Sequence, residues 1–153
     1  MLKISSSVEY AARVLLFMAG EKAGEPVSAG KIASSENIPR DYVDQILLRL
    51  RRAGLIKSTR GAHGGYHLAG SPDSISVAAI VRAVDEGVFE LVCDKYSAGD
   101  IQCSHTDDCG IRPVWQRLGG LVEDFLGRVT LKQLSEEEIQ VESRVDRLFK
   151  APK

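Results

Sequence analysis

Residues 39–68 read PRDYVDQILLRLRRAGLIKSTRGAHGGYHL, and this stretch decides the fold. Its first half repeats apolar residues every three to four positions, which predicts an apolar stripe along an amphipathic helix. Pro39 suits the first helical position, where its missing N–H is not needed, and Gly54 suits the left-handed residue after the last turn. The predicted stripe consists of Tyr42, Val43, Ile46, Leu47, Leu50 and Ala53.

The second half of this stretch predicts a β-hairpin. Residues 55–59 and 66–68 are short β-prone runs, and the connection between them is rich in glycine. Arg60 and His63 lie near the tip of this hairpin. A helix followed at once by a hairpin is typical of a winged helix-turn-helix, in which the helix enters the DNA major groove and the wing touches the backbone or the minor groove.

The residues before this stretch supply the other half of a helix-turn-helix. Ser28 is a suitable N-cap for a short helix that runs to Glu36, with Ile32 and Ala33 facing inward. Asn37 is a residue type that tolerates the left-handed conformation expected at the end of this helix. The order of the elements and the length of the turn therefore favour DNA binding.

Charge is distributed unevenly along the chain. The net charge of −1 and the pI near 6.3 argue mildly against a nucleic-acid partner. Residues 1–70, however, hold ten Lys/Arg against six Asp/Glu, a net of +4, whereas residues 71–153 hold ten against fifteen, a net of −5. Arg49, Arg51 and Arg52 taken alone indicate only a solvated helix surface. The basic half nevertheless contains the predicted helix and wing, which provides a positive surface for DNA.

The length of 153 residues fits one domain, or one small domain with an oligomerisation arm. We divide the chain into a winged helix-turn-helix domain (1–86), a cysteine-rich segment (87–112), and a dimerisation helix with a C-terminal tail (113–153). No apolar run approaches 18 residues, and the N-terminus lacks the pattern of a signal peptide, so we expect a cytoplasmic protein without a membrane span.

Further helices are predicted on either side of the central stretch. Residues 5–7 offer a cap for a first helix that Gly20 and Gly24 end. Its expected inner face is Val8, Ala11, Ala12, Leu15 and Ala19. Residues 71–73 form a turn, after which Ser76 is expected to cap a helix through Val84. Its expected buried residues are Val77, Ile80 and Val84.

A helical period returns at Pro113. The stripe consists of Val114, Leu118, Leu121, Val122, Phe125, Leu126 and Val129. We expect this long apolar helix to pack against its copy in a second subunit; the alternative is that it packs on its own domain. Thr130 is a candidate cap for a further turn at 131–134. A weaker stripe of Val141, Val145, Leu148 and Phe149 predicts a last helix. The expected fold class is therefore mainly α with a small β-hairpin wing.

All three cysteines lie in the segment 87–112. Cys93, Cys103 and Cys109 are separated by nine and five residues. Three is an odd number of cysteines, and the chain has no secretion signal. Clustered thiols of this kind favour zinc or an iron–sulfur cluster over a disulfide framework. Thiol redox chemistry and small buried side chains are the alternatives. His105 would complete a Cys₃His zinc tetrahedron, or it is a solvent-exposed loop residue.

With these residues in view, the chain resembles the Rrf2 superfamily of bacterial winged-helix repressors, whose members include IscR, NsrR and RirA. The resemblance covers about residues 1–134. It is carried by VEYAARVLLFMA, YVDQILLRLRRAGLIKSTRGAHGGYHLA, ISVAAIVRAVDE, the three-cysteine segment, Trp115 and VTLKQL. The family implies a homodimer with a long crossing helix, a palindromic double-stranded DNA site and, where three cysteines are present, an iron–sulfur cluster, either [2Fe-2S] or [4Fe-4S].

Two departures from the IscR pattern bear on the ligands. IscR-like members space their cysteines by five and five residues, and they carry a histidine ligand three residues past the last cysteine. That position is Arg112 here, which cannot ligate. In NsrR-like sensors an acidic residue near the N-terminus of the partner subunit ligates instead, and the matching position is Glu9. The resemblance thus implies Cys93, Cys103 and Cys109, with Glu9 of the partner subunit as fourth ligand and His105 as the alternative. By itself, Glu9 indicates only an acid beside a helix dipole.

We therefore expect a dimeric, sequence-specific regulator, a repressor that senses iron, nitric oxide or redox state. Base contacts are expected from Arg40, Asp44 and Gln45; phosphate contacts or packing from Tyr42, Arg52 and Lys57; and minor-groove contacts from Arg60 and His63. There are two alternatives. One is a regulator that senses through bare thiols or a zinc site, and the other is an adaptor that uses the winged fold to bind proteins. An enzyme is disfavoured, because the sequence has no GK[ST] P-loop, no G-x-S-x-G elbow and no HExxH pair.

Overall fold

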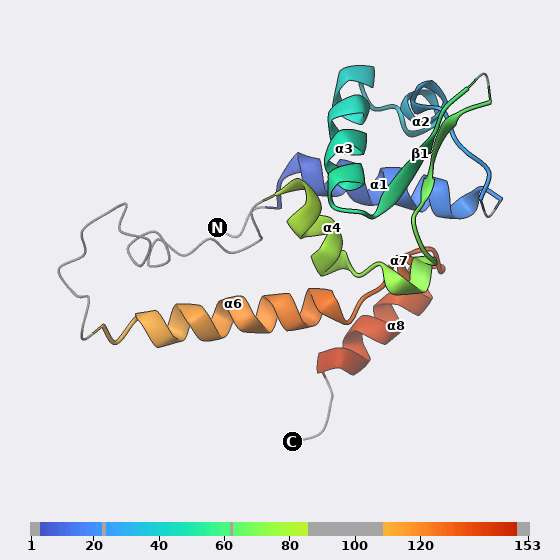
Figure 1. Cartoon of the computed structure of the whole chain (residues 1–153). Helices are drawn as coiled ribbons and strands as arrows, with labels where there is room; N and C mark the ends of the chain where they lie inside the picture. Colours follow the sequence, from blue (N-terminus) through green and yellow to red (C-terminus); the bar gives the residue numbers. More distant parts are fainter. Residues whose placement is uncertain (1–3, 23, 62, 86–108, 150–153) are drawn as a thin grey trace.

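The computed structural model describes residues 4–22, 24–61, 63–85 and 109–149. The described part is mainly helical with one two-stranded antiparallel hairpin, which confirms the predicted winged-helix fold (Figure 1). In chain order the elements are α1 (Ser6–Gly20), α2 (Ala29–Glu36), α3 (Arg40–Arg52), β1 (Ile56–Thr59), β2 (Gly65–Leu68), the 3₁₀ turn η1 (Pro72–Ser74), α4 (Val77–Val84), α6 (Arg112–Gly127), α7 (Leu131–Leu134) and α8 (Glu138–Phe149).

The helix-turn-helix is formed by α2 and α3, and local signals fix its ends. The Ser28 side chain accepts a hydrogen bond from the Lys31 N–H at 3.1 Å, as predicted for an N-cap. Asn37 adopts the left-handed conformation at φ 52°, and Gly54 does so after α3 at φ 75°. One prediction is off by a residue: Pro39 is the cap of α3, and the helix begins at Arg40.

The core of the winged unit, which we take as α1–α4 with the hairpin, lies between α3 and α1. Four residues of the predicted α3 stripe are buried: Val43, Ile46, Leu47 and Leu50. The other two are corrections. Tyr42 is 48% exposed because its ring sits at the edge of the core, edge-on to Tyr10 at a centroid distance of 6.0 Å. Ala53 is exposed because it caps the end of the helix.

The first helix is more deeply buried than its predicted inner face. Its buried residues are Val8, Ala11, Val14, Leu15 and Met18, whereas Ala12 and Ala19 are only partly covered. The reason is that α1 packs against α2, α3, α4 and α7 and so has a wide apolar surface. In helix α4, Ile80 and Val84 are buried as predicted, and Ala78 and Val81 are buried as well. The third predicted residue, Val77, is only partly buried.

A third backbone segment fastens the hairpin to the winged unit. Strands β1 and β2 pair in the register Ile56↔Leu68 to Thr59↔Gly65. Val27 adds an antiparallel bridge to Tyr66, with both N–H groups donating to the opposite carbonyl at 2.8 Å. A Cβ atom on Gly65 would lie 2.5 Å from the Val27 carbonyl oxygen, so only glycine allows the two backbones to approach this closely.

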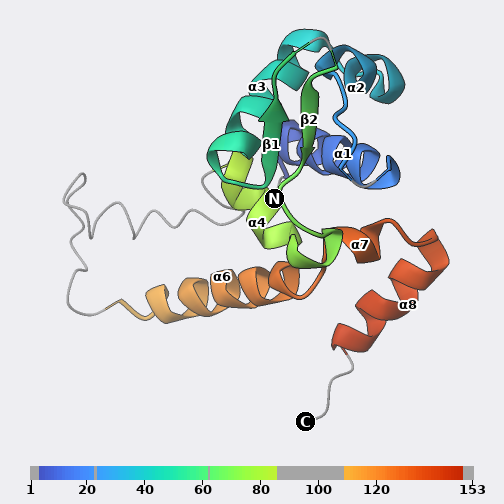
Figure 2. The same cartoon turned by 45° about the vertical axis from the view of Figure 1, so that its right-hand side comes forward.

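The chain after α6 returns to the winged unit. The Val77 N–H donates to the Val129 carbonyl, and the Leu131 N–H donates to the Ile75 carbonyl, both at 2.8 Å. Thr130 and Gln133 form a reciprocal capping box at the start of α7, which confirms the predicted cap. Leu131 is fully buried, so this short turn completes the core. In Figures 1 and 2 the N-terminal end of α6 projects past the winged unit, and α8 folds back beneath α7. None of the helices in the described ranges is long and apolar enough to cross a membrane.

Gly65→Ala should destabilise the fold by about 1–3 kcal/mol, because the added methyl group overlaps backbone that cannot move without breaking the Val27 bridge. Gly20→Ala is the matched control, since a Cβ there meets nothing within 4 Å. The free energy of unfolding from urea titration measures both. Equal stabilities for the two variants would contradict the assigned role of the Val27 bridge.

Candidate nucleic-acid interface

One face of α3 points away from the core. Asp41, Gln45, Leu48 and Arg52 recur at helical spacing opposite the buried stripe, and all four are exposed. We call these four residues the recognition face. Arg40, Asp44 and Arg51 lie along one flank of it, and Tyr42 and Arg49 along the other. In Figures 1 and 2 the N-terminal end of α3 and the tip of the hairpin lie at the same end of the winged unit.

Arg40 and Asp44 are paired at the start of α3. The Arg40 Nε donates to Asp44 Oδ2 at 2.9 Å, and both side chains are about half exposed. A solvated pair one turn apart contributes at most about 1 kcal/mol, so it opens at little cost. Each group then remains available for a base edge: the guanidinium for guanine acceptors, the carboxylate for the cytosine amino group.

The wing presents its basic residues on the side away from the core. Lys57 lies on β1 opposite His67 and is exposed, and Arg60 and His63 are exposed near the tip. The tip turn is fixed by a hydrogen bond from the Gly64 N–H to the Gly61 carbonyl at 2.9 Å. A Cβ on Gly64 would come within 2.3 Å of the Thr59 carbonyl, so the turn requires glycine there. A basic tip on a tight turn suits a phosphate or minor-groove contact.

The structure thus places all eight predicted DNA-contacting residues on α3 or the hairpin, and all eight are exposed: Arg40, Tyr42, Asp44, Gln45, Arg52, Lys57, Arg60 and His63. Sequence reasoning missed Leu48, which is 39% exposed in the middle of the recognition face. Its position three residues after Gln45 and four before Arg52, off the buried stripe, was the available signal. An apolar side chain there is suited to contact a thymine methyl group.

The predicted sensing residues are only partly described. Cys93, Cys103 and His105 lie outside the described residues, as does most of the predicted segment 87–112. Cys109 is a free, partly buried thiol three residues before α6, and its carbonyl accepts a hydrogen bond from the Arg112 N–H at 3.2 Å. Glu9 is exposed in the first turn of α1. Within the described ranges, no three His, Cys, Asp or Glu side chains are grouped to hold a metal ion.

Helix α6 packs only the C-terminal end of its predicted apolar stripe on the winged unit. Leu126 packs against the core beside α4, and Val129 is buried beyond the helix end. The rest of the stripe is left in contact with solvent: Val114 is 54% exposed, Leu118 37% and Leu121 50%. The cause is that the C-terminal part of α6 contacts α4, whereas its N-terminal end projects past the winged unit. Beside this face Leu121, Phe125 and Leu148 border a hollow of about 320 Å³.

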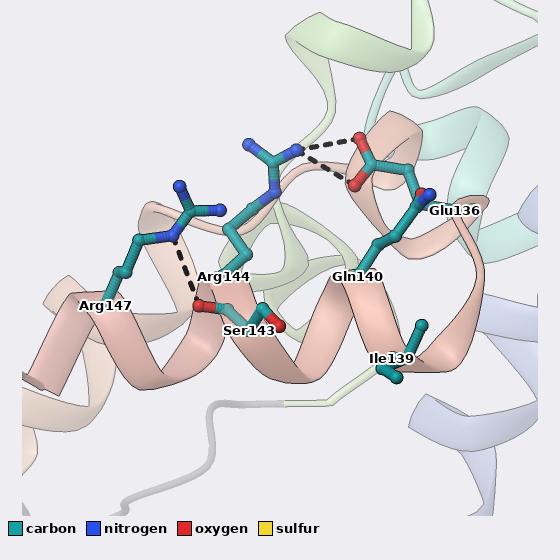
Figure 3. Close-up of a pocket in the computed structure, with 6 residues that line it drawn as sticks. All are labelled: Glu136, Ile139, Gln140, Ser143, Arg144 and Arg147. Atoms are coloured by element: carbon teal, nitrogen blue, oxygen red, sulfur yellow. Dashed lines mark hydrogen bonds and ion pairs between the residues drawn. The ribbon is translucent and has the colours of Figure 1, made fainter.

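A second hollow, of about 370 Å³, lies along α8 (Figure 3). Its polar groups bond to one another. Arg144 Nη2 donates to both carboxylate oxygens of Glu136 at 2.9 Å, and Arg147 Nε donates to the Ser143 carbonyl at 3.2 Å. The Arg144–Glu136 bonds hold α8 to the turn that precedes it, and the Arg147 bond lies within α8; we therefore interpret this hollow as structural.

Comparison with known proteins gives a consistent assignment. Residues 4–137 match the family model Rrf2, described as an iron-dependent transcriptional regulator. Among curated proteins, the chain is 32% identical to the HTH-type transcriptional regulator IscR of Vibrio vulnificus over 147 residues, which cover 95% of this chain and 85% of the relative. The IscR of Pectobacterium carotovorum is 33% identical over 147 residues, which cover 95% of this chain and 87% of the relative.

Solved structures agree with the fold. CymR, the global cysteine regulator of B. subtilis, superposes with a TM-score of 0.69 and 32% identity over 88% of this chain and 97% of its own. IscR of T. potens superposes with a TM-score of 0.66 and 30% identity, covering 86% of this chain and 84% of its own. The relatives therefore include both an IscR and a regulator named for cysteine.

Two substitutions on this surface should have different effects on DNA binding. Arg60→Ala should weaken binding to all sequences and lower the slope of log affinity against log salt by about 0.9, if one phosphate contact is lost. Gln45→Ala should leave that slope unchanged and relax the preference for one base pair, at about 1–3 kcal/mol per lost bidentate contact. Fluorescence anisotropy with an operator and single-base variants measures both effects.

The matched control is Lys132→Ala, which removes one exposed positive charge from α7, on a different element from the recognition face and the wing. It should bind like the wild-type protein. If Arg60→Ala and Gln45→Ala also bind like the wild type, the assignment of this surface is wrong.

Proposed function

This chain belongs to the Rrf2 family of DNA-binding transcriptional regulators, and from that premise we propose that it is a homodimeric repressor whose operator affinity is set by an iron–sulfur cluster. It is a regulator and not an enzyme. The observation that carries the proposal is the position of Cys109, three residues before α6, the helix whose apolar face is exposed to solvent. A sensing group at this point of the chain lies next to the surface that would join two subunits.

The proposed dimer uses the exposed face of α6. Val114, Leu118 and Leu121 lie on successive turns of that helix, where a second copy would remove them from water. A two-fold pair of such helices presents two winged units with opposite orientation, which suits the half-sites of a palindromic operator. The DNA partner places the proposed activity in the cytoplasm.

The proposed cluster ligands are Cys93, Cys103 and Cys109, with Glu9 of the partner subunit as the fourth. The described donors fit this role, because the Cys109 thiol is free and partly accessible and the Glu9 carboxylate is exposed. When bound, an iron–sulfur cluster supplies electron transfer and reactivity toward small molecules. A carboxylate is a harder donor than a thiolate, so it would hold its iron less firmly. Three thiolates would anchor the group, while the iron held by Glu9 would be open to attack by a small molecule.

A second candidate is a regulator that senses through bare thiols or zinc. Arg112 favours it, since this side chain stands where IscR-like members carry a histidine ligand and cannot itself bind a metal. In this case His105 would join the three cysteines around zinc. Anaerobic purification followed by an absorbance spectrum and by iron, sulfide and zinc assays separates the two candidates.

Leu121→Asp should convert the dimer to monomers that lose tight operator binding, because it would bury an unpaired charge at the centre of the α6 face. Gln116→Asp is the matched control: it adds the same charge at an exposed position of α6 away from the apolar face. Light scattering at micromolar concentration measures both variants. A wild-type monomer, or a Leu121→Asp dimer, would falsify the assigned interface.

Single substitutions test the proposed ligands. After reconstitution without oxygen, each Cys→Ala variant should lack the cluster, since thiolates are the anchoring ligands. Glu9→Ala should retain the cluster at first, lose it faster and show an altered spectrum. Glu25→Ala, which removes an exposed carboxylate outside α1, should behave like the wild type. If Glu9→Ala is unchanged and His105→Ala destroys the site, His105 is the fourth ligand and the zinc arrangement gains support.

A further inference from the structure

Arg49 differs from the other arginines at the end of α3. Its Nη1 donates to the carbonyl oxygen of Val84 at 2.6 Å, in a partly buried contact. Val84 is the last residue of α4, and its carbonyl is one of the four that a helix leaves without an intrahelical partner. A positive charge at a helix C-terminus is also favoured by the helix dipole. Arg49 therefore caps α4 from α3.

Helix α4 is the element that contacts both the recognition helix and α6. Arg49 joins its last residue to α3, and Arg82 forms an ion pair with Glu123 of α6. Val81 and Val84 are buried in the core, and α4 packs against α1, α3 and α6 (Figure 1). In sequence, Val84 precedes Cys93 by nine positions, and Cys109 precedes α6. Both ends of the cysteine-bearing part of the chain thus join helices that contact each other.

We propose that Arg49 is a positioning residue for DNA binding, which holds the C-terminal half of α3 to the end of α4 without touching DNA itself. It lies on the flank of α3 and outside the recognition face, and its guanidinium points to the protein backbone. A displacement of the last turn of α4 would break this bond or move α3 with it. If the cysteines sense a signal, as proposed above, Arg49 transmits it to the recognition face; this step rests on the proposed function.

The test compares Arg49→Met with Arg51→Met. Both variants remove one positive charge from the same turn of α3, and Arg51 is exposed on the opposite flank. Operator affinity is measured by anisotropy as a function of salt. Arg49→Met should weaken binding about tenfold with an unchanged salt slope, because a positioning residue neutralises no phosphate. Arg49→Lys, which keeps a charged donor, should recover part of the affinity. A slope lowered by about 0.9 in Arg49→Met, or wild-type affinity, would overturn the proposal.

A second arm tests the transmission. Operator affinity is measured for cluster-loaded and cluster-free protein, and the ratio of the two is compared between wild type and Arg49→Met. The wild-type ratio should fall in the usual allosteric range of about 5- to 150-fold, and the Arg49→Met ratio should approach one. An unchanged ratio in Arg49→Met would contradict transmission through Arg49. If the wild-type ratio is itself one, the sensing role is wrong, and the salt slope still decides whether Arg49 positions α3.

Discussion

The burial of one side of α3 determines which of its residues face solvent. Val43, Ile46, Leu47 and Leu50 are removed from water together, and each fully buried side chain of this size contributes about 1.5–3 kcal/mol. Because a helix is rigid, this packing also fixes which residues face outward. Gln45 and its neighbours on the recognition face are exposed as a direct consequence. The recognition face is therefore specified by the core, and a substitution that rotates α3 would disturb both.

A second constraint is the central position of α4. It packs on α1, receives the Arg49 guanidinium at its last carbonyl and is paired to α6 through Arg82 and Glu123. Helix α4 of the winged unit therefore contacts the proposed dimerisation helix α6 directly, in addition to the covalent connection along the chain. Leu131 reinforces this arrangement, because it is buried in the winged unit although it follows α6 in sequence. Changes in the spacing of two subunits and in the orientation of α3 would in this way be coupled mechanically.

Local features of the fold were predictable from the sequence, and features set by the neighbours of an element were not. The Ser28 and Thr130 caps, the left-handed Asn37 and the hairpin depend on a few adjacent residues, and all four predictions are confirmed. Periodicity could not show that Tyr42 lies at the edge of the core. The spacing of apolar residues indicates which side of a helix is buried, but it does not indicate how far around the helix the burial extends. Periodicity also could not show which end of the α6 stripe packs on the winged unit. The contact made by Arg49 could not be predicted either, because its partner is a backbone carbonyl 35 residues away in the sequence.

The central claim is that the cysteine-bearing part of the chain and the recognition helix communicate through α4. Amide hydrogen exchange of the whole 153-residue chain, with the proposed cluster and after its removal, tests this most directly. The account predicts that cluster removal changes protection in the last turn of α4 and in α3 near Arg49, while β1 and β2 exchange at the same rates in both forms. A change confined to the residues between α4 and α6, with α3 identical in the two forms, would contradict it.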